Sequence, residues 1–128
     1  MKVLLDTHAF IWWDSDPTKL SPQARVACED RTNVVLLSVA SVWEMQIKLQ
    51  LGKLDLRLPL AEVIASQQQT NDIQVLSVAL GHVLALQDLP AHHKDPFDRL
   101  LIAQANVEEA VLISHDPVFA QYPVKVLW

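Results

Sequence analysis

The sequence predicts an α/β fold, a three-layer α/β/α sandwich around a mainly parallel five-stranded sheet. Three observations lead to this prediction. Five short apolar runs are spaced along the chain, and segments with helical start and stop signals separate them. The 128 residues are 51% hydrophobic and include only two glycines, a composition that suits a single packed core. We therefore expect one domain that covers residues 1–128.

Each expected strand is a short run of apolar residues that is continuous rather than alternating. Continuous runs are typical of parallel strands that helices cover on both faces. The expected strands are residues 2–6, 34–37, 73–76, 110–114 and 124–127, of which 73–76 is the weakest.

The expected helices lie between these strands and have recognisable ends. Ser21 and Pro22 open the first as N-cap and first-turn proline, and Ser38 or Ser41 opens the second, which Gly52 ends. Three further helices are expected at residues 59–69, 78–86 and 96–108. Strands that alternate with helices imply right-handed crossovers and hence parallel pairing.

Two apolar segments exceed what one small sheet needs. Residues 54–58 alternate leucine with charged residues, an extended pattern, and Trp12 and Trp13 lie near the N-terminus. Two interpretations stay open: these side chains pack in the core, or they form a homodimer face or a groove for a partner helix.

Cysteine use, hydropathy and charge limit the class of protein. Cys28 is the one cysteine, which fits a reducing cytoplasm, and its amphipathic surroundings favour a packing role. We see no secretory signal and no apolar stretch of roughly 18 residues, so we expect no membrane segment. The net charge of −5 counts against a surface rich in phosphate-binding cations. Carboxylates that hold divalent cations would remove part of that objection.

Four carboxylates fall where ligands collect in open parallel sheets, near the carboxyl ends of the strands. Asp6 ends the first expected strand, and Asp116 follows the fourth by two residues. Glu44 lies early in the helix after the second strand, and Asp98 lies in the first turn of the helix before the fourth. Oxygen ligands alone point to Mg²⁺ or Mn²⁺. Such ions suit phosphodiester hydrolysis, so these four are the candidate catalytic and metal-binding residues.

Each acid also has a purely structural interpretation. Asp95 and Asp116 both precede a proline, as N-cap residues do, and Ser41 and Glu44 have the spacing of a capping box. A carboxylate at a helix N-terminus gains about 0.3–1 kcal/mol. Two carboxylates about 5 Å apart repel by roughly 3 kcal/mol at an effective dielectric constant near 20. A converging cluster would therefore need protons or a cation, and the sequence permits convergence without proving it.

Helical spacing separates the roles of three neighbouring charged residues. Asp95 should be the N-cap, with its carboxylate bound by the N–H groups of residues 97 and 98. Asp98 shares a face with the apolar positions at 101, 102 and 105, so its side chain should point toward the sheet. Arg99 should turn toward solvent or substrate.

Four blocks of the sequence resemble, in order, those of the VapC group of PIN-domain proteins. They are LLDTHAFIWW, SVASVWEMQIKLQLGKL, LPAHHKDPFDRLLIAQA and LISHDPVF, and the resemblance covers nearly the whole chain. It implies a PIN-like fold, a Mg²⁺- or Mn²⁺-dependent acidic site and cleavage of single-stranded RNA. It also implies a homodimer and a small antitoxin partner, usually DNA-binding, so that the chain would be the toxin of a toxin–antitoxin pair.

The resemblance also assigns residues to roles. Asp6, Glu44 and Asp98 would be the core acids and Asp116 the fourth. Ser114 would support the fourth acid or a bound water. Further matching or candidate positions are His8 and His93, which have no assigned role, and Lys48, Lys94 and Arg99 as phosphate contacts. The alternative function is a non-catalytic PIN-fold module that binds a partner protein through its apolar helices.

Overall fold

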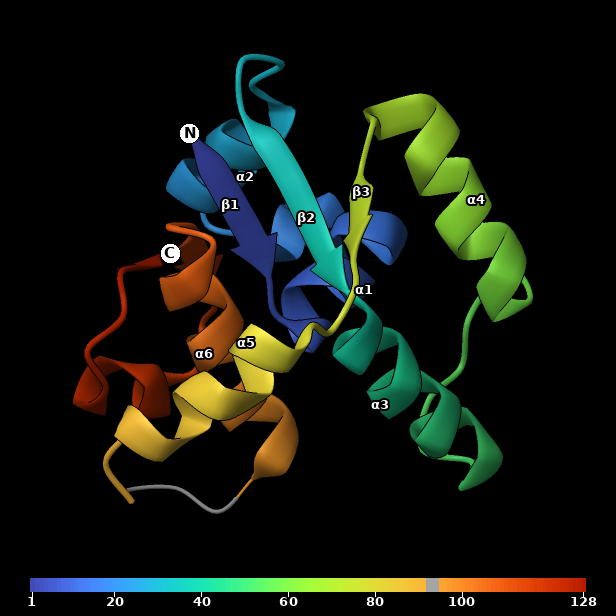
Figure 1. The fold of residues 1–128 in the computed structure, drawn as a ribbon. Coiled ribbons are helices and arrows are strands. Elements are labelled where there is room, and N and C mark those ends of the chain that lie inside the picture. Colours follow the sequence, from blue (N-terminus) through green and yellow to red (C-terminus); the bar gives the residue numbers. More distant parts are fainter. Residues whose placement is uncertain (92–94) are drawn as a thin grey trace.

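The computed structural model describes residues 1–91 and 95–128 and confirms the α/β/α sandwich with a five-stranded sheet (Figure 1). The strand order is β3-β2-β1-β4-β5, and each neighbouring pair is parallel. The strands are β1 (Lys2–Leu5), β2 (Val34–Ser38), β3 (Gln74–Leu76), β4 (Val111–Ile113) and β5 (Val126–Leu127). All five lie within or next to the runs expected from the sequence.

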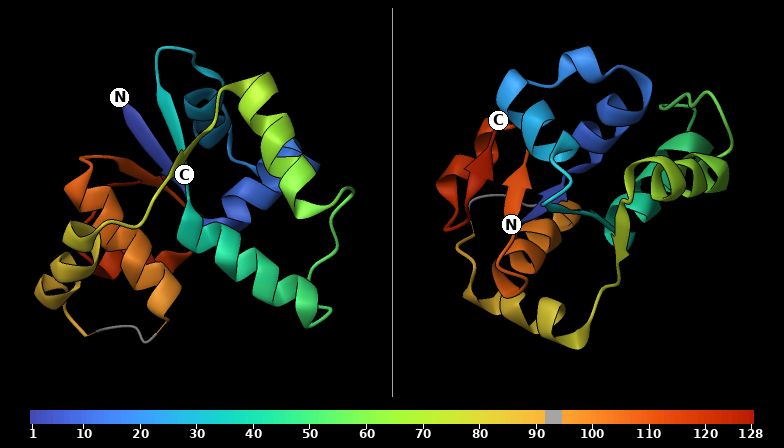
Figure 2. Two further views of the ribbon diagram at one scale, coloured as in Figure 1. Left: turned by 45° about the vertical axis from the view of Figure 1, so that its right-hand side comes forward. Right: turned by 90° about the horizontal axis from the view of Figure 1, so that it is seen from above.

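Helices cover both faces of the sheet. The view from above in Figure 2 shows α1 and α2 on one side of the sheet, with α5 and α6 on the other. The helices are α1 (Thr7–Ser15), α2 (Pro22–Glu29), α3 (Val39–Gln50), α4 (Leu60–Asn71), α5 (Leu80–Leu84) and α6 (Pro96–Val107). Three 3₁₀ segments complete the described chain: η1 (Pro17–Lys19), η2 (Ala85–Asp88) and η3 (Pro117–Gln121).

The two layers of core arise from the alternation of side chains along each strand. In β1, Val3 and Leu5 face the core beneath α1, α2 and α4, while Leu4 faces the core beneath α6. In β2, Leu37 and Leu36 divide in the same way. Successive side chains of a strand point to opposite faces, so a continuous apolar run supplies both cores at once.

Helix α1 was not expected from the sequence. Asp6 is its N-cap, and the Ala9 N–H donates to the Asp6 carboxylate at 2.7 Å. The helix buries Phe10 and Trp13, while the bulky Trp12 on its other side is also half-buried. Its apolar residues therefore surround most of the helix, and no polar face marks the helical period.

The expected capping box at Ser41 is wrong. Ser38 is the N-cap of α3, and its hydroxyl accepts from the Ala40 N–H at 3.0 Å. Ser41 lies inside the helix, which leaves Glu44 one turn further in and available for another contact. The expected stop at Gly52 is confirmed, because Gly52 takes a φ of +69° just after the helix.

The leucine segment at residues 54–58 packs mainly against the core. Of its three leucines, Leu54 and Leu56 are half-buried and pack against the core on the α1 side of the sheet, and Leu58 is exposed. The Arg57 guanidinium also pairs with the buried Asp14 carboxylate of α1 at 3.0 Å. Of the two interpretations left open, the structure therefore favours core packing over a partner face at this segment.

Cys28 has the expected packing role. Its side chain is buried in the core beneath α2, and burial, with the nearby Glu29 charge, raises the pKa of its thiol to about 12. The thiol therefore stays protonated at neutral pH. Among the described residues, no helix is both long and apolar enough to span a bilayer.

The described packing predicts that two leucine-to-alanine substitutions have very different effects on the free energy of unfolding. Leu112 lies fully buried in β4, whereas Leu51 follows α3 and is 62% exposed. We expect Leu112→Ala to lower the free energy of unfolding by about 2–5 kcal/mol because it leaves a cavity. Leu51→Ala should change it by less than about 0.5 kcal/mol. Denaturant titration measures both, and equal losses would contradict the described packing.

Candidate functional site

The central feature of the site is a buried carboxylate at the carboxyl end of β1. Asp6 follows the strand directly, and its backbone N–H donates to the Ile113 carbonyl of β4 at 3.0 Å. One carboxylate oxygen accepts from the Ala9 N–H and the other from the Ser114 hydroxyl, at 2.7 and 2.5 Å. Burial raises the pKa of Asp6 even though both hydrogen bonds act to lower it.

Asp116 lies beside Asp6 because its strand is the neighbour of β1. The chain leaves β4 and turns at Ser114, whose hydroxyl accepts from the Asp116 N–H at 3.1 Å. The Asp116 carboxylate caps η3 by accepting from the Val118 N–H at 3.0 Å, so the expected N-cap role is confirmed. Its negative charge also acts to raise the pKa of Asp6. Ser114 thus links the two acids: its hydroxyl donates to the Asp6 carboxylate and accepts from the backbone N–H of Asp116.

Asp6 and Asp116 open onto one cavity of about 260 Å³. Its remaining lining residues are His8, Trp12, His115 and Pro117. Strands β1 and β4 are the place where the order of the sheet reverses, with β2 and β3 on one side and β5 on the other. Crevices at such switch points bind ligands in open α/β sheets. A larger apolar hollow near Met1 and Val26 contains no acidic pair and lies at the opposite end of β1.

Glu44 reaches the same region from α3. The Thr7 hydroxyl donates to one of its carboxylate oxygens at 2.5 Å, and the Lys48 ammonium lies 3.7 Å from the other. Thr7 directly follows Asp6, so Glu44 lies next to the Asp6 segment. Glu44 does not line the cavity that Asp6 shares with Asp116.

Asp98 lies in the first turn of α6. Around it, the predictions for the N-cap and for the apolar face of the helix are confirmed, and the prediction for Arg99 is not. Asp95 is the N-cap and accepts from the Phe97 and Asp98 N–H groups at 2.9 and 3.2 Å. The positions that share a face with Asp98, at 101, 102 and 105, are buried against the sheet. The Phe97 ring contacts Trp43 of α3, with ring centroids 5.2 Å apart, so this end of α6 lies against the helix of Glu44.

The expected orientation of Arg99 is wrong. Its guanidinium donates to the Pro90 carbonyl at 2.9 Å and lies 3.5 Å from the Leu86 carbonyl and the Tyr122 hydroxyl. It therefore binds the segment that precedes α6 and does not turn to solvent. The expectations for His93 and Lys94 lie outside the described residues.

The donor set suits a hard cation, but the described residues do not form a closed metal site. Asp6 is nearly solvent-free, is close to a second carboxylate and takes part in no ion pair within the described part of the chain. Such a carboxylate pair favours a cation with oxygen ligands. Across residues 1–91 and 95–128, no three His, Cys, Asp or Glu side chains are grouped closely enough to hold one ion.

A cluster of four rings borders the acids and was not predicted. Trp12 contacts His8, His115 and Trp128, with centroids 5.9, 6.3 and 5.8 Å apart, and His115 contacts Trp128 at 5.2 Å. The sequence showed an excess of apolar side chains near Trp12, but nothing in it paired Trp12 with residues more than 100 positions away.

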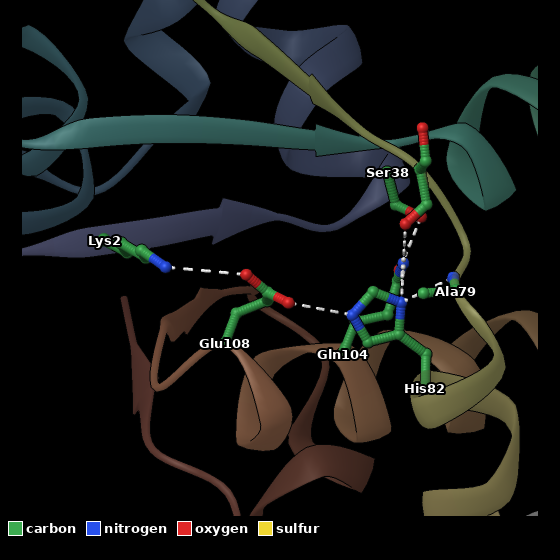
Figure 3. Close-up of polar contacts among 7 residues, drawn as sticks. Lys2, Ser38, Ala79, His82, Gln104 and Glu108 are labelled. Carbon is green, nitrogen blue, oxygen red and sulfur yellow. Dashed lines mark hydrogen bonds and ion pairs between the residues drawn. The ribbon is translucent and has the colours of Figure 1, made fainter.

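A buried polar network behind the site was also missed (Figure 3). Ser38, the N-cap of α3, donates to the Gln104 side-chain carbonyl of α6 at 2.5 Å. His82 of α5 accepts at Nδ1 from the Ala79 N–H at 2.9 Å, so a neutral ring carries its proton on Nε2. That nitrogen lies 2.9 Å from Glu108, and this hydrogen bond is the main cause that lowers the pKa of Glu108. The network fixes α3, α5 and α6 relative to one another.

A carboxylate pair at the switch point of a parallel sheet offers oxygen ligands to a divalent cation, and comparison with known proteins gives the family. A family model described as the PIN domain matches residues 3–125. This chain belongs to the PIN domain family. The fold and the family that the four sequence blocks indicated are both confirmed.

Individual proteins are also similar to this chain in sequence or in fold. The chain is 27% identical over 104 residues to ribonuclease VapC22 of Mycobacterium tuberculosis, which covers 80% of this chain and 78% of that protein. Its fold is similar to VapBC2 from Rickettsia felis bound to a promoter DNA fragment (TM-score 0.74, 13% identity, 99% and 98% coverage). It is also similar to FitAcB from Neisseria gonorrhoeae (TM-score 0.62, 19% identity, 98% and 96% coverage).

The raised pKa of Asp6 predicts how stability depends on pH. The folded state holds the Asp6 proton more tightly than the unfolded state, so this group lowers the stability as pH rises through and above its ordinary range near 3.8. Asp6→Asn keeps an acceptor for the Ala9 N–H and removes the charge. We expect the variant to melt at or above the wild-type temperature at pH 7 without divalent ions, and to lack this component of the pH profile.

The wild type and Asp6→Asn also test whether a divalent cation binds at these acids. Millimolar Mn²⁺ or Mg²⁺ should raise the melting temperature of the wild type, since a cation at a hundredfold excess over its Kd adds about 2.7 kcal/mol. The rise should be much smaller for Asp6→Asn. A wild-type melting curve that is indifferent to both ions would count against a cation at these acids.

Proposed function

We propose that this protein is an endoribonuclease that hydrolyses RNA phosphodiester bonds with Mg²⁺ or Mn²⁺, and that it is the cytoplasmic toxin of a toxin–antitoxin pair. The observation that carries the proposal is the pair of carboxylates, Asp6 and Asp116, on one cavity at the switch point of a PIN domain. Support for RNA as the substrate comes from the relative named ribonuclease VapC22. Support for an antitoxin comes from the fold's likeness to VapBC structures.

The proposed site uses Asp6, Glu44, Asp98 and Asp116 to hold one or two cations. A divalent cation bound there would lower the pKa of a water molecule and offset the charge that develops on the phosphate. The hydroxyl of Ser114 holds the Asp6 carboxylate, and the hydroxyl of Thr7 holds that of Glu44. These hydrogen bonds fix one oxygen of each acid and leave lone pairs on the same groups for a ligand.

Among the described candidates, Lys48 supplies positive charge near the proposed site. Its ammonium lies 3.7 Å from Glu44 and its side chain is 29% exposed, so it can reach a phosphate beside the acids. Arg99 is less well placed, since its guanidinium binds backbone carbonyls. We therefore propose Lys48 as the phosphate contact among the described candidates.

A non-catalytic module that binds a partner protein is the second candidate function. The net charge of −5 and the exposed apolar side chains on α3 and α5 favour it. A nuclease assay on the purified protein with Mn²⁺, using structured and unstructured RNAs, separates the two candidates. Absence of cleavage on every RNA, together with a melting curve that ignores cations, would favour the binding module.

Two aspartates three residues apart give a matched test of the proposed nuclease. Asp98→Asn removes a charge from the proposed site, so RNA cleavage should fall by orders of magnitude with little loss of stability. Asp95→Asn keeps a competent N-cap and should keep much of the activity. Both variants are measured on the same RNA. Equal rates would mean that the roles on α6 are assigned wrongly, and full activity in Asp98→Asn would contradict the acidic site.

We also propose a homodimer, because α3 and α5 expose apolar side chains that include Trp43 at 63% and Leu80 at 73%. Such surface is typical of an interface. Light scattering at high micromolar concentration should show a dimer, and Leu80→Glu should shift it toward monomer. A wild type that stays monomeric under these conditions would contradict the dimer.

A further inference from the structure

The acidic cavity that Asp6 and Asp116 line is also lined by rings. His8, Trp12 and His115 line it, and Trp128 packs against Trp12 and His115 without lining it. We call these four residues the ring cluster. His8 and His115 are exposed and both contact Trp12, and all three side chains line the same 260 Å³ cavity as the acids.

We propose that the ring cluster is a stacking site for one unpaired nucleobase of the RNA, adjacent to the phosphate on which the acids act. The inference rests on the proposed function, and it adds where a base binds and by which force. Every base has an aromatic face, so a stacking site tolerates different sequences.

Size and chemistry both favour a base as the occupant. Pockets for drug-sized ligands are about 300–1,000 Å³, and this cavity of about 260 Å³ suits a single ring system. Its lining combines aromatic rings with imidazole nitrogens and carboxylates, groups that suit the apolar faces and polar edges of a nucleobase. A base inside a duplex is already stacked and would not be available to this cavity.

The net charge of the chain is an independent reason to expect a stacking contact with RNA. The chain carries −5, so it gains little affinity for RNA by neutralising phosphates. Among the described candidates, Lys48 beside Glu44 offers one positive charge to a phosphate, and the guanidinium of Arg99 is bound to backbone carbonyls. Stacking does not depend on net charge, so it can add affinity for RNA that an anionic surface does not supply.

The test measures equilibrium binding, independently of cleavage. The probes are a five-nucleotide unpaired RNA and a chain of the same length without bases, each titrated against the Asp98→Asn protein with Ca²⁺ in place of Mg²⁺. Stacking of one base predicts that removal of the bases weakens binding about tenfold. The slope of log affinity against log salt should be shallow, near the value of about −0.7 expected for one neutralised phosphate.

Matched variants locate the contact. His8→Ala with His115→Ala should remove most of the tenfold preference for the RNA with bases, whereas His115→Phe, which keeps a ring, should retain it. Leu51→Ala is the control, because Leu51 is an exposed residue after α3 that does not line the cavity, and it should keep the full preference. The same proteins should melt at similar temperatures, since His8 and His115 are exposed.

The outcomes separate this inference from the proposed function. Equal affinity for the two probes, no binding of either probe, or an unchanged preference in the double alanine variant overturns the stacking site. Cleavage of RNA by the wild type with Mn²⁺ tests the proposed function separately, and it can succeed where the stacking site fails. A preference that is lost with the two histidines and kept in the His115→Phe and Leu51→Ala variants supports the stacking site.

Discussion

The Asp6 carboxylate is held at the end of β1 between two donors, the Ala9 N–H and the Ser114 hydroxyl. The first bond starts α1 where the strand stops, and the second joins the ends of two adjacent strands. Burial of a carboxylate costs free energy that two hydrogen bonds offset only in part, and the raised pKa of Asp6 reflects the remainder. This corner of the sheet therefore favours a positive charge that the described side chains do not supply through an ion pair with Asp6.

The same shortage of positive charge extends over the surface. Arg25, Arg31 and Arg57 each pair with an acid. Exposed pairs of this kind add little to stability, but they occupy cations that could otherwise bind phosphate. Under the proposed function, affinity for RNA would therefore come from Lys48, from a cation at the acids and from contacts that carry no charge. The acids and the ring cluster line a single cavity, so these contributions would act together.

The sequence predicted the parts of the fold that depend on short-range signals. Continuous apolar runs located all five strands, and a serine or aspartate before proline located the starts of α2 and α6. Helix α1 was missed because its apolar side chains surround most of the helix and hide the period. The start of α3 was left open between Ser38 and Ser41, since both are competent N-caps, and the choice depends on the buried contact of Ser38 with Gln104. That contact joins residues 66 positions apart.

The difference between short-range signals and long-range packing also explains which parts of the candidate site were predictable from the sequence. Asp6 and Asp116 are brought together by strand register, because Leu5 pairs with Ile113 in neighbouring parallel strands, and the sequence pattern was sufficient to place both at one rim. Glu44 and Asp98 are instead carried by α3 and α6, whose positions depend on the packing of whole helices and on the Trp43–Phe97 contact. A small rotation of either helix changes the distance of its acid from Asp6 but leaves the Asp6–Asp116 pair unchanged. Within the proposed site, the register-defined pair is therefore the fixed half, and Glu44 and Asp98 form the half whose geometry depends on helix packing.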